Sequence, residues 1–146
     1  MIDLDNQTDL SFELSKLEQI ADALSTKEVE LLIVDDATIE ALNMEHKGKA
    51  STTDVLSFPL NAPVTEQSLF GIPLGSIIIA SSFVKMKAAE FGHTEQDELS
   101  LLFIHGMLHL LGFDHETDEG EMRMRENELI IKFDLPKSLI IRTEDN

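Results

Sequence analysis

The sequence of 146 residues predicts an α+β fold in which a small four-stranded mixed sheet is packed with about five helices. Three observations predict this class. Short apolar or β-branched runs alternate with longer segments of helical spacing, and glycine and proline separate these segments. Hydrophobic residues make up 42% of the chain, which is enough for a core and too many for a disordered acidic chain. The length favours a single domain over residues 1–146.

The N-terminal part of the chain predicts a strand, a helix and a second strand. Residues Ile2–Asn6 alternate between apolar and polar side chains, as a half-buried strand does. Residues Ser11–Leu24 carry apolar side chains at close to helical spacing, with Asp9 or Ser11 as the candidate N-cap. The compact apolar run Glu30–Val34 predicts a strand.

The middle of the chain predicts a short helix and two further strands. Asp35 and Asp36 favour a helix start, and the helix continues over Ala37–Met44. Residues Val55–Phe58 predict a strand that Pro59 closes. The β-branched segment Gly75–Ala80 predicts the fourth strand.

Three helices are predicted after the fourth strand. The first covers residues 81–91, with Ser81 or Ser82 as the cap and Gly92 as the stop. The second extends from Thr94 to the turn at Gly112, and its apolar side chains point nearly all round the axis, which indicates a buried central helix. The last covers about Asp118–Phe133.

The charge excludes one broad class of function. The chain has 11 basic and 28 acidic residues, a formal net charge of −17. General electrostatic binders of DNA or RNA neutralise phosphates with lysine and arginine, and this chain has few of them. An enzyme with a small local basic site remains compatible with this composition.

The N-terminus and the longest apolar run predict a cytoplasmic protein that does not span a membrane. The first five residues are acidic where a secretion signal needs a basic region. The longest apolar run is shorter than the roughly 20 residues that cross a bilayer. The chain has no cysteine, so a metal site would have to use histidine, aspartate or glutamate.

Three of the five histidines lie within eleven residues on and just after the predicted central helix. His105 and His109 are spaced i, i+4, which places both rings on one face. Gly112 allows the chain to turn back, so that His115 can supply a third nitrogen. Three histidines with one open position are typical of a catalytic Zn²⁺ site, one ion per chain, in a zincin-like layout. The alternative is a set of hydrogen-bonded core histidines.

The residue after the first histidine argues against peptide hydrolysis. Zinc proteases carry glutamate there as the general base, and this chain carries Gly106. Glycine has no side chain that could accept a proton, so a different substrate is expected.

The histidine segment resembles the signature of the YbeY family of bacterial endoribonucleases, His-Gly-x-x-His-Leu-x-Gly-[Tyr/Phe]-Asp-His, over residues 105–115. A second block also resembles the family, with Leu42-Asn43 ahead of Lys47-Gly48-Lys49 and then Thr53–Pro59. The segment Leu74–Ile79 matches a third block only loosely. The family usually has arginine at the position of Lys47, and lysine cannot grip a phosphate with a bidentate fork.

The resemblance implies a single-strand-specific, zinc-dependent endoribonuclease. It implies action in maturation of the 3′ end of 16S rRNA and in late-stage 70S ribosome quality control, with zinc on His105, His109 and His115. The expected partners are single-stranded rRNA and the ribosome or its small-subunit proteins, with no DNA and no membrane. Two alternatives stay open: a metal-dependent hydrolase of another substrate, and a ribosome-assembly factor whose metal is structural.

We expect further residues to contribute to this site. Lys47 could neutralise charge on the scissile phosphate, with Lys49 beside it. Without the family resemblance, a solvated loop is the favoured interpretation of both lysines. Asp114 is expected to orient a ligand histidine or to support the turn. Ser57 ends a strand that could line the cleft. The candidates for the general base are Glu116 and a metal hydroxide.

The remaining polar residues are expected to be structural. His46 and His93 lie beside loop signals and are expected to be exposed and without function. The acidic residues of the last helical region are expected to form a solvated face: Glu116, Asp118, Glu119, Glu121, Glu126 and Glu128.

Overall fold

The computed structural model describes residues 2–47, 55–59, 74–114 and 117–136, with the side chains of residues 46, 47 and 59 left out. Within these residues the chain forms four strands and five helices, so the predicted α+β class is confirmed. The strands are β1 (Ile2–Asn6), β2 (Val29–Val34), β3 (Val55–Pro59) and β4 (Gly75–Ala80).

The four strands form one mixed sheet in the order β1-β2-β4-β3. β1 pairs parallel with β2, and β2 pairs parallel with β4. β3 runs antiparallel to β4 at the edge, where Ser57 is opposite Ile77. Each parallel connection passes through helical structure, as the geometry of parallel pairs requires.

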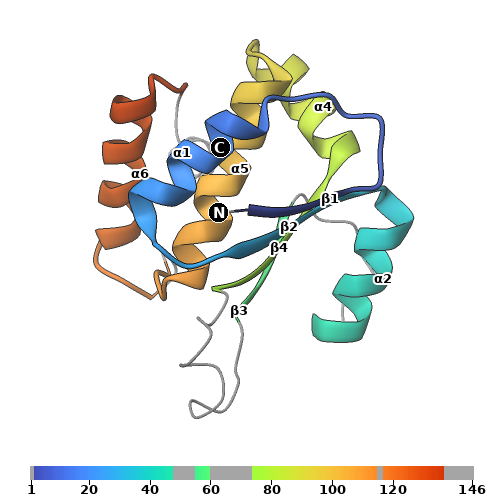
Figure 1. The fold of residues 1–146 in the computed structure, drawn as a ribbon, viewed down its shortest axis with the longest axis horizontal. Coiled ribbons are helices and arrows are strands. Elements are labelled where there is room, and N and C mark those ends of the chain that lie inside the picture. The colour runs from blue at the N-terminus through green and yellow to red at the C-terminus, as the bar shows by residue number, and fades with distance from the viewer. Residues whose placement is uncertain (1, 48–54, 60–73, 115–116, 137–146) are drawn as a thin grey trace.

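The two faces of the sheet are covered by different helices. α2 (Asp36–Lys47) lies on one face, and α1 (Leu14–Leu24), α5 (Glu95–Leu110) and α6 (Glu121–Phe133) lie on the other (Figure 1). Side chains of a strand alternate between faces, so Ile77 and Ile79 of β4 enter the larger core while Ile78 and Ala80 enter the smaller core beside α2.

The central helix α5 is buried, as its all-round apolar pattern predicts. Leu99, Leu102, Phe103 and Met107 are completely buried, and they occupy the core that α5 shares with α1, α6 and the sheet. A helix in this position is held by contacts along most of its surface, which makes it a rigid support for the side chains that it carries.

Two predicted helix starts, those of α1 and α6, and two predicted N-caps are wrong in detail. α1 begins at Leu14 rather than Ser11, and Glu13 occupies the N-cap position in place of Asp9 or Ser11. The Glu13 N–H donates across the fold to the side-chain oxygen of Gln96 at 2.7 Å. Ala80, not a serine, precedes the first residue of α4 (Ser81–Phe91).

Ser82 of α4 and Asp118, which precedes α6, form side-chain hydrogen bonds that differ from their predicted roles. The Ser82 hydroxyl donates to the Asp36 carboxylate of α2 instead of capping its own helix. α6 begins at Glu121 rather than Asp118. The Asp118 carboxylate accepts hydrogen bonds from the backbone N–H of Gly120, the residue before the helix, and from that of Met122, the second residue of the helix. The partner of Ser82 lies 46 positions away on another helix, so the local sequence pattern does not reveal that bond, whereas the partners of Asp118 lie within four residues.

No helix among the described residues is long and apolar enough to cross a membrane.

Candidate metal centre

The candidate site is built on the C-terminal half of α5. This helix starts as predicted, with the Thr94 hydroxyl accepting a hydrogen bond from the Asp97 N–H at 3.0 Å. Three acidic residues occupy the first turn and His109 occupies the last turn, so the charges at both ends agree with the helix dipole.

His105 and His109 point their rings toward each other, as their spacing predicts. The two Nε2 atoms are 3.2 Å apart, and the ring centroids are 4.7 Å apart with the ring planes at 75°. Two nitrogens bound to one tetrahedral zinc at 2.0–2.1 Å are separated by about 3.3 Å. The separation of the two Nε2 atoms therefore fits two ligands of a single ion.

The third predicted ligand, His115, lies outside the described residues. The chain turns just before it, and Gly112 has a φ of 98°, the left-handed conformation predicted for this glycine. Across the described residues there is no group of three or more side chains suited to hold a metal. The full histidine triad thus stays a prediction, with two of its members placed together.

Gly106 allows α5 to approach the sheet closely. A Cβ at this position would lie 2.9 Å from Cγ2 of Ile77 and 3.1 Å from Oγ of Ser57. The side-chain direction of residue 106 therefore points at β3 and β4. A glutamate at this position would have to displace the side chains of Ile77 and Ser57, so the packing of α5 on the sheet disfavours the base of the zinc proteases here.

Ser57 contacts the same turn of α5. Its hydroxyl donates to the backbone carbonyl of Gly106 at 3.2 Å, and the side chain is partly buried. This bond ties β3 to the helix between the two histidines. The predicted role of Ser57 in substrate binding is untested by this contact.

The predicted phosphate-binding lysines lie at the end of α2 and beyond it. Lys47 is the last residue of α2, and its side chain is outside the described part of the chain. Lys49 and the candidate base Glu116 are also outside it. Asp114 is partly buried, and its carbonyl accepts the N–H groups of Thr117 and Asp118 at 3.1 and 3.0 Å, so its backbone supports the turn that leads to α6.

Glu126 was not predicted as a site residue, and the expectation that it is solvated is wrong. Its side chain is 2% exposed, and Oε2 lies 2.8 Å from Nδ1 of His105. A sequence signal existed: Met122, Glu126 and Leu129 are spaced i, i+4, i+7, so the glutamate lies within the buried stripe of α6. The prediction assigned Glu126 to the solvated face because the residue is charged.

The expectation for His93 is also wrong. Its side chain is 10% exposed, and Nε2 lies 2.7 Å from Oε1 of the fully buried Glu98. Both residues are at the N-terminal end of α5, so the pair stabilises the helix start and is separate from the candidate site.

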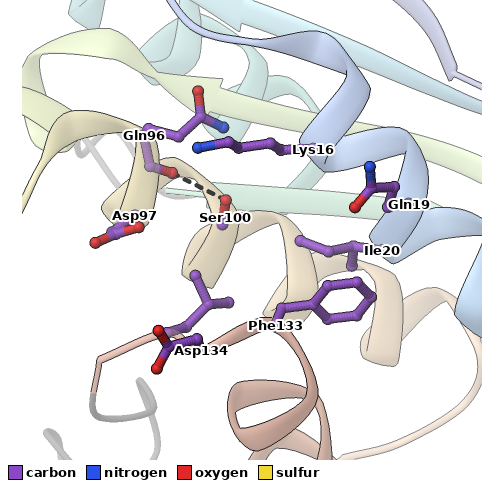
Figure 2. Close-up of a pocket in the computed structure, with 9 residues that line it drawn as sticks. Lys16, Gln19, Ile20, Gln96, Asp97, Ser100, Phe133 and Asp134 are labelled. Atoms are coloured by element: carbon purple, nitrogen blue, oxygen red, sulfur yellow. Dashed lines mark hydrogen bonds between the residues drawn. The ribbon is translucent and has the colours of Figure 1, made fainter.

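A pocket of about 300 Å³ lies elsewhere, between α1, the start of α5 and the end of α6 (Figure 2). Its polar lining includes Lys16, Gln96 and Ser100, and the Ser100 hydroxyl donates to the carbonyl of Gln96. From Ser100, the lining residue nearest to His105 on α5, the helix rises about 7.5 Å to His105, and neither histidine lines the pocket, so the two are distinct.

Comparison with known proteins identifies the family to which the sequence is similar. The family model described as endoribonuclease YbeY matches residues 3–134. A protein of Sulfurovum sp. named endoribonuclease YbeY is 58% identical over 144 residues, covering 99% of this chain and 98% of the relative. The protein of that name from Nautilia profundicola is 52% identical and covers 99% of this chain and 100% of the relative.

A solved structure supports the fold. The solution structure of a Thermotoga maritima protein is 28% identical, with a TM-score of 0.59, and covers 91% of this chain and 89% of the other. The sequence matches extend over almost the whole chain and include the histidine segment on α5. The chain therefore belongs to the YbeY endoribonuclease family.

Proposed function

We propose that this chain is a single-strand-specific endoribonuclease that depends on one Zn²⁺ held by His105, His109 and His115. Membership of the family makes the chain an RNA-cleaving hydrolase. The observation that carries the zinc dependence is the 3.2 Å separation of the Nε2 atoms of His105 and His109, which matches two ligands of one tetrahedral ion. The buried helix, the left-handed Gly112 and the following histidine support a zincin-like layout.

The proposed site binds and orients an RNA phosphodiester through a few side chains. When bound, a cation with an open position can activate water or polarise a phosphoryl oxygen. His105 and His109 hold it from adjacent turns of a helix that the core keeps rigid. Lys47 and Lys49 would neutralise the scissile phosphate, and Ser57 would contact the RNA from the edge strand β3.

Asp114 and the general base complete the proposed site. Asp114 would orient a ligand histidine from the turn that its carbonyl already supports. Glu116 is the candidate side chain for accepting the proton from the attacking water. The tests of these roles are single alanine variants assayed for cleavage and for zinc content separately, since a base variant would keep the metal and a ligand variant would lose it.

The surface charge restricts how RNA and the ribosome can be engaged. With a net charge of −17, most of the protein repels a polyanion, so contact with RNA would be confined to the histidine site and its lysines. Many small-subunit ribosomal proteins are basic and would complement the acidic surface. We infer that the chain acts on rRNA in this setting, in maturation of the 3′ end of 16S rRNA and in late-stage 70S ribosome quality control, and hence in the cytoplasm.

The experiment combines metal analysis with an RNA cleavage assay. We expect one zinc per freshly purified chain, cleavage of single-stranded RNA in preference to duplex RNA, and loss of both zinc and cleavage in His109→Ala with circular dichroism unchanged. His46→Ala, a histidine outside the proposed triad, is the control and should keep both. Cleavage that survives complete removal of zinc would refute the zinc dependence.

Two other outcomes would identify the alternatives. A folded, zinc-loaded protein that cleaves no RNA with any divalent metal would favour an assembly factor with a structural ion. Docking on ribosomal proteins is tested separately, by reversing several surface acids: unchanged binding to small-subunit proteins would refute the electrostatic argument.

A further inference from the structure

We propose that Glu126 of α6 is a positioning residue for the metal site, which holds the ring of His105 so that Nε2 is available to the ion. The inference rests on the proposed metal-binding function of His105 and His109. It adds a residue from a different helix, 21 positions along the chain from His105.

The contact between Glu126 and His105 is buried. Glu126 is 2% exposed and His105 is 14% exposed at the side chain, and the Oε2 to Nδ1 distance of 2.8 Å is that of a charge-assisted hydrogen bond. Burying a carboxylate without a hydrogen-bonded partner is costly, so a glutamate at this position must be compensated by its contacts. The nearest cation in sequence, Arg125, pairs with the exposed Glu128 at 2.9 Å instead.

The carboxylate selects one tautomer of His105. An ionised carboxylate only accepts hydrogen bonds, so Nδ1 must carry the proton and Nε2 of the neutral ring keeps its lone pair. Nε2 is the atom that lies 3.2 Å from Nε2 of His109. Glu126 thus leaves unprotonated the nitrogen that faces the proposed ion, and it restrains rotation of the ring.

The carboxylate also contributes charge. Three neutral imidazoles would leave the full double positive charge on a bound Zn²⁺, and a carboxylate hydrogen-bonded to one of the rings makes that ring a stronger ligand. α6 therefore has a second role beyond packing on α5. It places a negative charge beside Nδ1 of His105, on the side of the ring opposite to the nitrogen that would bind the ion.

The test is the zinc affinity of Glu126→Gln and Glu126→Leu, measured by competition with a chromophoric chelator at fixed pH. Glu126→Gln keeps the size of the side chain and an acceptor oxygen but removes the charge, and we expect the affinity for zinc to fall about 10-fold. The second removes the acceptor, and we expect a loss approaching 100-fold. Glu128→Gln makes the same chemical change on the exposed face of the same helix and should bind zinc like the parent protein.

A second readout separates positioning from simple support of the fold. The ring ¹⁵N resonances of His105 in the metal-free protein should show the Nδ1–H tautomer in the parent and in Glu128→Gln, and a mixture with the Nε2–H tautomer in Glu126→Leu. A generally weakened fold would broaden many signals but would not exchange one tautomer for the other. Urea unfolding confirms that each variant is folded where binding is measured.

The outcomes distinguish this inference from the function on which it rests. If the parent binds zinc and His109→Ala does not, while both Glu126 variants bind as tightly as the parent with unchanged His105 tautomer, the role of Glu126 is refuted and the metal site stands. If the parent and His109→Ala show the same absence of zinc binding, the metal site fails and this inference fails with it.

Discussion

Replacing Gly106 with alanine tests whether the close approach of α5 to the sheet is a requirement of the fold. The added Cβ would lie 2.9 Å from Cγ2 and 3.3 Å from Cδ1 of Ile77, and 3.1 Å from Oγ of Ser57. Carbon atoms in favourable contact are about 3.5–4.0 Å apart, so the first contact is short by about 0.6 Å or more. Ile77 is completely buried and cannot move into solvent.

Two opposing terms set the size of the effect. Inserting a methyl group into a packed core costs about 1–3 kcal/mol. Alanine is favoured over glycine in a helix interior by about 1 kcal/mol. We therefore expect Gly106→Ala to lower the free energy of unfolding by about 1 kcal/mol net, which corresponds to a fall in the melting temperature of about 3 °C for a chain of this length. Urea unfolding followed by circular dichroism measures it.

The matched control repeats the substitution in an Ile77→Ala background. That background removes both contacts with Ile77, so only the helix propensity and the contact with the Ser57 hydroxyl remain. The effect of Gly106→Ala should then reverse in sign and stabilise the protein by up to about 1 kcal/mol. An equal loss of stability in both backgrounds would show that Ile77 is not the obstacle, and a gain in the parent background would refute the close packing itself.

Three further predictions concern the core, the start of α5 and the pH response. Phe103→Ala empties a fully buried position and should lower the free energy of unfolding by about 3–5 kcal/mol, measured in urea. Glu98→Ala leaves His93 without its buried partner and should cost about 3 kcal/mol, whereas Glu95→Ala in the exposed first turn should cost much less. Hydrogen bonds from Thr38 lower the pKa of Asp35 below its ordinary 3.8. A carboxyl whose pKa is lower in the folded state stabilises the fold at pH values above its unfolded pKa, and this stabilisation is lost as the pH falls through the folded pKa. The stability difference between parent and Asp35→Ala should therefore be constant above about pH 5 and shrink as the pH falls below it. A difference that persists at pH 2 would contradict this assignment.

Periodicity along the chain was enough to predict the elements and their class. The four strands and five helices of the described residues occupy the segments that alternation, β-branched runs and helical spacing indicate. Thr94 and Gly92 were recognised as helix boundaries because capping and left-handed turns depend on residues a few positions apart. Helix starts that depend on distant partners, such as Gln96 for α1, were not predictable from local pattern.

The candidate site also has features that local spacing predicts and features that only tertiary contacts decide. The spacing of His105 and His109 determined by itself that two rings share one face, since helical geometry is local. Glu126 reaches His105 only because α6 packs beside α5, whereas His93 contacts the buried Glu98 five residues along the chain. The expectation of exposure rested on charge for Glu126 and on neighbouring loop signals for His93, and the structure overturns it for both residues.

The sequence by itself therefore determined the elements, the histidine pair and the glycine turn, all of which follow from contacts within a few residues. The tertiary structure alone decided what surrounds them: the side chains of β3 and β4 that crowd Gly106, and the buried carboxylate behind His105. These features join residues from separate elements, and their free energies depend on packing and desolvation that no local spacing encodes.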